Sequence, residues 1–181
     1  IVIGKNKEDD IREAKFLKEK NIPHIFVNRE IEDKEVNSIG PDLERAAYDI
    51  VNLLVQSGHE RILTLGKPEE SLVDEKKILG YKRALCEAKL NWERNFFTYK
   101  DHDEWESIIR GRLRESNPPD SFFGLCDSYS IRFANIAREE GFKIPEDISI
   151  IGMDDIDMAK YSFPPLTTVD IPFKQMGIVA V

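Results

Sequence analysis

The stretch ISIIGMDDIDMAKYSFPPLTTV, residues 148–169, runs from an apolar segment into two adjacent carboxylates and then into a pair of prolines. Its first six residues are typical of a buried strand, and Asp154 and Asp155 follow where that strand ends. A carboxylate beside a buried strand is costly unless something binds it or hydrogen-bonds to it. The two prolines give the chain a rigid path into a second strand-like run at residues 166–169. This stretch therefore predicts a strand end at which acidic side chains meet a partner.

The rest of the chain repeats the same alternation of apolar strand-like runs and helical patterns. The expected strands are residues 1–4, 22–27, 36–40, 61–66, 95–99, 121–126 and 148–153, and the expected helices are residues 8–20, 41–57, 74–89, 103–115 and 128–140. Gly58 and Gly141 are placed to end the second and the fifth of these helices. Strands that are apolar on both faces and alternate with helices predict an α/β fold with a parallel sheet covered by helices.

In such sheets, ligands bind in a crevice beyond the carboxyl ends of the strands. Asp154 follows the strand at 148–153, and Asp127 follows the strand at 121–126. Asn28 and Arg29 follow the strand at 22–27 in the same way. We therefore expect these polar side chains to face one shared crevice.

Composition excludes several classes of protein. The chain has 181 residues and a formal net charge of −8, which argues against a direct grip on a nucleic-acid backbone. No apolar stretch approaches the roughly 20 residues that span a bilayer. The only two cysteines suggest no disulfide framework, so a cytoplasmic location is expected. Because the chain opens within a strand pattern and closes within a helix pattern, we expect a fragment truncated at both ends.

Three stretches occur in order and cover nearly the whole chain: NSIGPDLERAAYDIVNLLVQSGHERI (37–62), GYKRALCEAKL (80–90) and GFKIPEDISIIGMDDIDMAKYSFPPLTTVDIPFKQMG (141–177). Together they resemble the effector-binding domain of the lactose-repressor/galactose-repressor (LacI/GalR) family of bacterial transcription regulators. The resemblance implies two lobes, each an α/β parallel-sheet sandwich of the periplasmic-binding-protein type I kind. Residues 1–37 would be part of the N-terminal lobe and residues 38–153 the C-terminal lobe. Residues 154–181 would carry the return crossover, with Val169 onward back in the first lobe.

The resemblance also implies a small effector, such as a sugar, held between the lobes. The family's contact positions map onto Asn28, Arg29, Lys77, His102, Cys126, Asp127, Asp154 and Asp170. Two of these depart from the family's pattern, since Lys77 stands where relatives carry arginine and Cys126 where they carry asparagine. Lysine keeps the charge but lacks the planar fork of arginine, which weakens recognition of hydroxyl pairs. An ionised carboxylate such as that of Asp154 accepts hydroxyl hydrogen bonds and so suits a polyol.

Structural roles compete with these ligand-binding roles. Asp155 and Asp127 each stand where an aspartate can cap the turn or helix that follows. Lys77 lies in the charged run DEKK and can equally be solvated. Cys126 can be a small apolar residue that ends a buried strand. Among these positions, Asp154 is the one for which ligand contact is favoured over a purely structural role.

No catalytic or metal-binding pattern appears in the sequence. There is no phosphate-binding G-x-x-x-x-G-K-[ST] loop and no G-x-S-x-G elbow, and the His, Cys and carboxylate spacings fit no zinc site. We therefore expect no enzyme, no cofactor and no metal. The main alternative to a regulator is a periplasmic sugar-binding protein of a transporter or chemoreceptor, because the fold alone does not separate the two.

For the regulator, the resemblance implies a homodimer that contacts operator DNA through an N-terminal domain outside this chain. The expected dimer face is the helix at 128–140, with Ile131, Ala134 and Phe133 as apolar contacts, together with residues 158–161. Ligand binding would favour one orientation of the lobes and so set the spacing of two DNA-binding domains.

Overall fold

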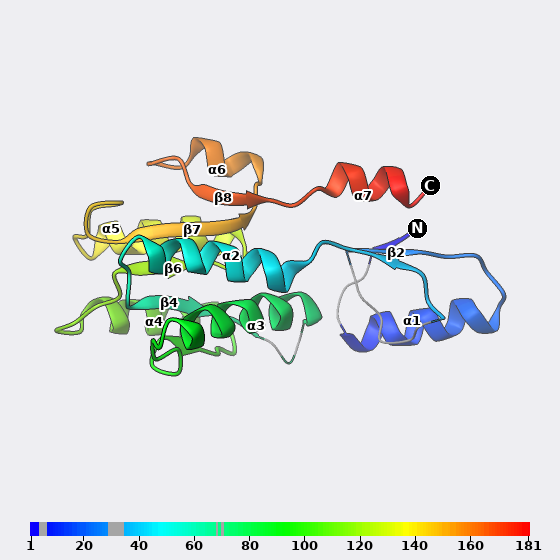
Figure 1. Ribbon diagram of the computed structural model, residues 1–181, viewed down its shortest axis with the longest axis horizontal. Coiled ribbons are helices and arrows are strands. Elements are labelled where there is room, and N and C mark those ends of the chain that lie inside the picture. Colours follow the sequence, from blue (N-terminus) through cyan, green and yellow to red (C-terminus); the bar gives the residue numbers. More distant parts are fainter. Residues whose placement is uncertain (4–6, 29–34, 68, 70) are drawn as a thin grey trace.

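A computed structural model describes residues 1–3, 7–28, 35–67, 69 and 71–181. The strands form two separate parallel sheets, which lie side by side along the long axis of the molecule (Figure 1). We call them the small sheet and the large sheet. Both ends of the chain lie at the end of the molecule that holds the small sheet (Figure 1).

The small sheet has the strand order β1-β2-β3, and all its strands are parallel. Its elements are β1 (Val2–Ile3), α1 (Lys7–Glu19), β2 (Phe26–Val27) and β3 (Ser38–Ile39). Ala14 of α1 packs with Phe26 and Val36 in a small apolar cluster. The expected connecting segment at 36–40 is therefore an edge strand paired with β2.

The large sheet has the strand order β5-β4-β6-β7-β8, again with all strands parallel. Its strands are β4 (Ile62–Leu65), β5 (Phe96–Phe97), β6 (Ser121–Phe123), β7 (Ser149–Asp154) and β8 (Thr167–Asp170). The helices of this part are α2 (Leu43–Gln56), α3 (Leu72–Glu87), α4 (His102–Leu113), α5 (Asp127–Glu139) and α6 (Asp157–Tyr161), and α7 (Phe173–Val179) follows β8. The expected α/β fold with helix-covered parallel sheets is confirmed.

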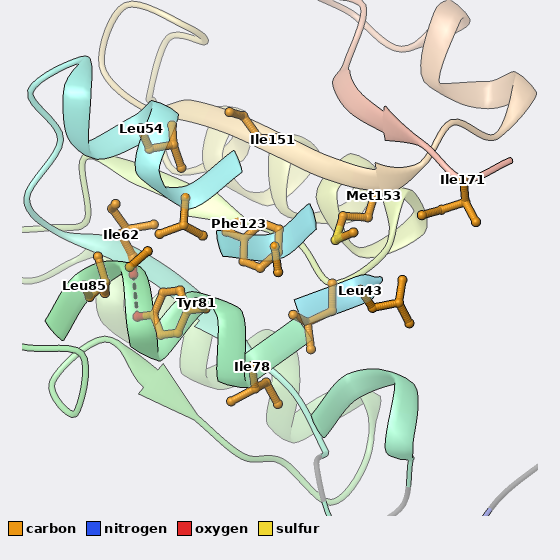
Figure 2. Close-up of a cluster of buried hydrophobic side chains, with 14 of the residues drawn as sticks. Leu43, Leu54, Ile62, Ile78, Tyr81, Leu85, Phe123, Ile151, Met153 and Ile171 are labelled. Atoms are coloured by element: carbon orange, nitrogen blue, oxygen red, sulfur yellow. Dashed lines mark hydrogen bonds between the residues drawn. The ribbon is translucent and has the colours of Figure 1, made fainter. Parts of the chain in front are cut away.

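Successive strand residues point to opposite faces of the large sheet, which is how one strand contributes to two cores. Phe123 packs with residues of α2 and α3, including Leu54 and Tyr81, in the cluster that Figure 2 shows. Its neighbour Phe122 points the other way and stacks on Phe133 of α5, with ring centroids 4.0 Å apart. Burying one such ring contributes about 1.5–3 kcal/mol, so a sheet buried on both faces is strongly stabilised.

Helix ends follow the signals in the sequence. Asp42 caps α2 by accepting a hydrogen bond from the backbone N–H of Arg45 (3.0 Å). Gly58 and Gly141 follow the ends of α2 and α5 with φ of 93° and 91°, a backbone region that favours glycine. Both glycines therefore end their helices as the sequence predicted.

The chain leaves the large sheet later than the return crossover was expected. β8 pairs with β7 through Asp170, with Met153 opposite Val169 and Asp154 opposite Asp170. The chain then runs to α7 at the end of the molecule that holds the small sheet (Figure 1). Ile171 and Met176 pack in the same apolar cluster as Leu43, and Val27 of β2 packs against that cluster. The division into lobes at residues 37/38 and 153/154 remains a prediction.

Candidate functional site

A pocket of about 320 Å³ lies at the carboxyl ends of the strands, and we call it the strand-end pocket. One lining residue, Asn28, follows β2 of the small sheet, whereas Leu65, Tyr99, Cys126 and Asp154 come from the ends of strands in the large sheet or just beyond them. The full lining is Asn28, Leu65, Val73, Asp74, Lys77, Tyr99, Leu125, Cys126, Tyr129, Asp154, Ile156 and Phe173. A compound in this pocket would therefore contact both sheets and α7.

A buried lysine spans the ends of β6 and β7 beside this pocket. Lys77 is only 3% exposed. Its ammonium donates a hydrogen bond to the carbonyl oxygen of Leu125 (2.6 Å) and lies 3.4 Å from Oδ1 of Asp154. A buried charge is tolerated only when it is paired or hydrogen-bonded, and both conditions hold here. The charge of Lys77 is therefore largely committed within the protein.

Burial raises the pKa of the Asp154 carboxyl above its ordinary value. The nearby ammonium of Lys77 acts in the opposite direction, while the negative charges of Asp127 and Asp74 add to the increase. The ionised form of Asp154 is therefore less stable in this position than it would be in water. A ligand hydroxyl that donates a hydrogen bond to it would partly replace the lost water.

Backbone strain gathers at the edges of the pocket. Asn28 has a φ of 57°, and Asp154 and Asp155 have φ of 117° and 48°. Residues other than glycine rarely adopt positive φ, and each such residue costs of the order of 1–3 kcal/mol. Strain of this kind persists only where the surrounding structure fixes it, and it is commonly found at ligand-binding sites.

Asp127 lies beside the pocket but is turned into the protein. It is fully buried and is absent from the pocket lining. Its Oδ2 accepts a hydrogen bond from the backbone N–H of Ile156 (2.9 Å), and its Oδ1 accepts one from the hydroxyl of Thr168 (2.6 Å). Asp127 is therefore not the helix cap that one structural interpretation placed here, since the N-cap position of α5 is Cys126.

The family model described as a periplasmic binding protein-like domain matches residues 51–181, which is well over half of the chain. This chain belongs to that family. The resemblance to LacI/GalR regulators is confirmed as well, because relatives of this periplasmic binding protein-like domain are regulators of that kind.

The curated relative CelR of Thermobifida fusca, a transcriptional regulator of the HTH type, is 24% identical over 181 residues, which cover 98% of this chain and 53% of CelR. The chain thus spans about half the length of the curated relatives it matches. A solved regulatory protein of LacI family from Chloroflexus aggregans matches with a TM-score of 0.89 and 28% identity, over 98% of this chain and 64% of that one. A solved complex of a transcriptional regulator CelR with cellobiose matches with a TM-score of 0.86 and 23% identity, over 99% of this chain and 55% of that one, and shows likeness of fold.

The fold brings four of the expected contact residues together. Asn28, Lys77, Cys126 and Asp154 all line the strand-end pocket. His102 and Asp170 do not line it: His102 is exposed at the start of α4 and Asp170 is exposed at the end of β8. Arg29 lies outside the described residues. The ligand-binding roles themselves stay predictions.

Asp155 differs from the expected cap. α6 begins at Asp157 with Ile156 at its N-cap position, and no side chain caps it. The backbone N–H of Asp155 instead donates to the hydroxyl of Thr168 (3.3 Å). The carboxylate pair after β7 is thus part of a turn that β8 holds in place.

Sequence reasoning missed several lining residues, above all Asp74, Tyr99, Tyr129, Ile156 and Phe173. Tyr99 ends the run NFFTY, so the strand-end rule applied to β5 would have found it instead of His102. Burial, together with the neighbouring hydroxyl of Tyr129, raises the pKa of Tyr99, which keeps its phenol protonated. Phe173 lines the pocket from α7, and no local pattern in the sequence predicts this position.

The described part of the chain holds neither a metal-ligand cluster nor a membrane-spanning helix. Among those residues, no group of three or more His, Cys, Asp and Glu side chains is arranged to hold a metal ion. Within the same residues, no helix combines the length and the apolar character that crossing a membrane requires.

Proposed function

We propose that this chain is the effector-binding part of a LacI-family transcriptional regulator and that a small, neutral, sugar-like compound binds in the strand-end pocket. The observation that carries the proposal is the origin of the lining, which comes from β2, from the ends of the large-sheet strands and from α7. A compound held there stabilises one arrangement of these parts over others, which is the physical requirement for a sensor. The similarity to CelR and to the Chloroflexus regulator supports this function.

The charges around the pocket favour a neutral ligand. Two carboxylates, Asp74 and Asp154, line it together with one ammonium, Lys77. Because Lys77 already donates to Leu125 and lies next to Asp154, it offers little to a phosphate group. An anionic ligand would also meet the carboxylates at close range, where repulsion in a partly buried site is strong.

The shape and the chemistry of the pocket suit a ring with hydroxyl groups. Tyr99, Tyr129 and Phe173 offer aromatic surface, and Asp154 and Asn28 offer acceptors and donors. A mostly apolar hollow with a few polar groups is the usual form of a small-molecule site, and 320 Å³ lies near the lower limit for such sites. The solved CelR structure of the same fold is a complex with cellobiose, which supports a sugar as the class of ligand here.

In the regulator that we propose, the ligand sets the relative orientation of the two lobes in each subunit of a homodimer. That orientation determines the spacing of DNA-binding domains that lie outside this chain. Met158 and Tyr161 of α6 are 60% and 79% exposed, which suits the dimer face expected there. Phe133 is fully buried in the core of the large sheet and therefore takes no part in such a face.

The regulator is preferred to the other candidates for specific reasons. The curated relative CelR is a transcriptional regulator rather than an enzyme, so no catalytic activity is proposed. The similarity to CelR also favours the regulator over a periplasmic sugar-binding protein of transport. Because a transcriptional regulator works where the chromosome is, the proposal places the protein in the cytoplasm.

The test is calorimetric titration of the intact protein with D-glucose, D-galactose, D-ribose, cellobiose and glucose 6-phosphate. At least one neutral sugar should bind, and glucose 6-phosphate should bind at least about ten-fold more weakly than that sugar. Asp154→Ala should weaken sugar binding by about ten-fold, which corresponds to about 1.4 kcal/mol. Asp170→Ala is the matched control, because Asp170 sits opposite Asp154 on the next strand but is exposed and outside the pocket.

Three results would contradict the proposal. If none of these sugars binds, a sugar is the wrong class of ligand. If the phosphate ester binds more tightly than every neutral sugar, the charge argument fails. If Asp154→Ala and Asp170→Ala have the same effect on affinity, Asp154 is not part of the site.

A further inference from the structure

The two strained residues at the end of β7 need something to hold them. Asp154 and Asp155 both have positive φ, and Asp154 carries the carboxylate that faces the strand-end pocket. A backbone of this kind relaxes unless neighbouring groups fix it. The hydrogen bonds of the next two amides show which groups do so.

Two side chains from different elements capture these amides. Thr168 of β8 accepts a hydrogen bond from the backbone N–H of Asp155 (3.3 Å), and Asp127 of α5 accepts one from the backbone N–H of Ile156 (2.9 Å). The hydroxyl of Thr168 also donates to Asp127 (2.6 Å), so the two side chains are bonded to each other. We call Asp127, Thr168 and the two amides the turn clamp.

The surroundings are shaped to admit the buried carboxylate of the clamp. Gly152 lies on β7 directly under it, and a Cβ atom at that position would sit 2.2 Å from Oδ1 of Asp127. That distance is far below any contact that carbon makes with oxygen, so a side chain at residue 152 would displace Asp127. Asp127 itself is fully buried, which makes its bonds inside the protein its only means of satisfying the charge.

The clamp joins the pocket to the segment that leaves the large sheet. On one side it fixes the turn that places Asp154 and Ile156 in the pocket wall. On the other side it includes Thr168, and β8 then leads within a few residues to Phe173, which also lines the pocket. A change in the turn therefore reaches β8 through two hydrogen bonds.

We propose that Asp127 and Thr168 are positioning residues that aim Asp154 into the strand-end pocket and couple it to the path of β8. The part of this inference that concerns a ligand rests on the proposed function. The clamp itself consists of hydrogen bonds between residues of the chain, so it can be tested even if no sugar binds.

The first test is amide hydrogen exchange, followed by mass spectrometry, on the intact protein and three variants. Thr168→Val keeps the shape of the side chain and removes the hydroxyl, and it should speed exchange in peptides covering residues 155–158 by about ten-fold. Thr168→Ser restores the hydroxyl and should bring exchange back to within about two-fold of the wild type. Thr167→Val is the matched control, since Thr167 is the preceding residue of β8 and is exposed.

The comparison between variants decides the outcome. If Thr168→Val exchanges at 155–158 no faster than Thr167→Val, the clamp does not hold the turn. If Thr168→Ser fails to restore slow exchange, the hydroxyl is not the group that matters, and the inference is overturned. Should Thr168→Val not fold, Thr168→Ala takes its place, because it also removes the hydroxyl, and faster exchange at 155–158 than in Thr168→Ser is then required.

The second test addresses coupling, again without a ligand. Asp154→Asn changes the charge at the pocket end of the clamp and should alter exchange in residues 167–171 by several-fold in the wild-type background. In the Thr168→Val background the same change should have much less effect, because the connection is broken. Equal effects in both backgrounds would show that Asp154 and β8 are not coupled through Thr168.

Discussion

In the sequence, β6 and β7 are alike in having aspartates at their carboxyl ends, but in the fold one of these aspartates is buried and the other lines the strand-end pocket. Each strand ends close to an aspartate that lies at the same edge of the large sheet. Asp127 is fully buried and gives its two carboxylate oxygens to Thr168 and the amide of Ile156. The side chain of Asp154 is 26% exposed, lines the strand-end pocket and lies beside Lys77 at 3.4 Å.

The difference shows that strand order decides at which edge of the sheet a residue lies, whereas the local backbone decides where its side chain points. Strand order and the parallel arrangement place both aspartates at one edge. Direction depends on the first residues after each strand: Asp127 is already within α5, whereas Asp154 is the last residue of β7 with a positive φ. One aspartate therefore supports the structure and the other is available to a ligand.

The largest expected effect is a difference in the free energy of unfolding between variants of the two aspartates. Asp127→Ala leaves the amide of Ile156 and the hydroxyl of Thr168 without acceptors inside the protein, so the free energy of unfolding should fall by about 3 kcal/mol. Asp154→Ala should lower it by no more than about 1 kcal/mol, because the raised pKa of Asp154 shows that the fold does not favour its charge. Urea unfolding at neutral pH measures both values. Equal losses would mean that the two aspartates do not differ in the way described.

Much of the fold could be predicted from the sequence because its signals are local. Gly58 and Gly141 end their helices as predicted, and every expected strand is present. The strands are shorter than expected, however. Among the described residues, the run at 22–27 contributes only Phe26 and Val27, which pair with β1 on one side and β3 on the other.

The pocket could be predicted only in part. The strand-end rule brought Asn28 and Asp154 to one hollow, because that rule follows from parallel strand order alone. It could not tell that Asp127 turns inward, since this depends on Thr168, which is 41 residues away in the chain. Nor could it find Phe173, whose position depends on how α7 packs after β8.

A second prediction sharpens the comparison through the glycine beneath Asp127. Gly152→Ala places a Cβ atom 2.2 Å from Oδ1 of Asp127 and 3.0 Å from Cδ2 of Leu166, so the free energy of unfolding should fall by about 2 kcal/mol. Gly111→Ala is the control, since Gly111 lies in α4 with no atom within 4 Å of the added Cβ. That control should stabilise the protein by up to about 1 kcal/mol, because alanine favours helix more than glycine does.

This prediction is checked by urea unfolding of both variants beside the wild type. If Gly152→Ala is as stable as the wild type, Asp127 can move without loss, and its two hydrogen bonds do not define the turn. A loss in Gly152→Ala that disappears when Asp127 is replaced as well would show that the two residues act on each other.

The smallest expected effect concerns pH and tests the other aspartate. Burial raises the pKa of Asp154 above its ordinary value of 3.8, so the folded state holds this proton more tightly than the unfolded state does. The contribution of Asp154 to stability should therefore fall as pH rises from about 3.8 through the raised pKa, and stay constant above it. Asp154→Asn removes the ionisation, so the variant should gain stability relative to the wild type across that interval, as urea unfolding at a series of pH values will show. If the wild type gained instead, the attraction of Lys77 would outweigh burial at Asp154.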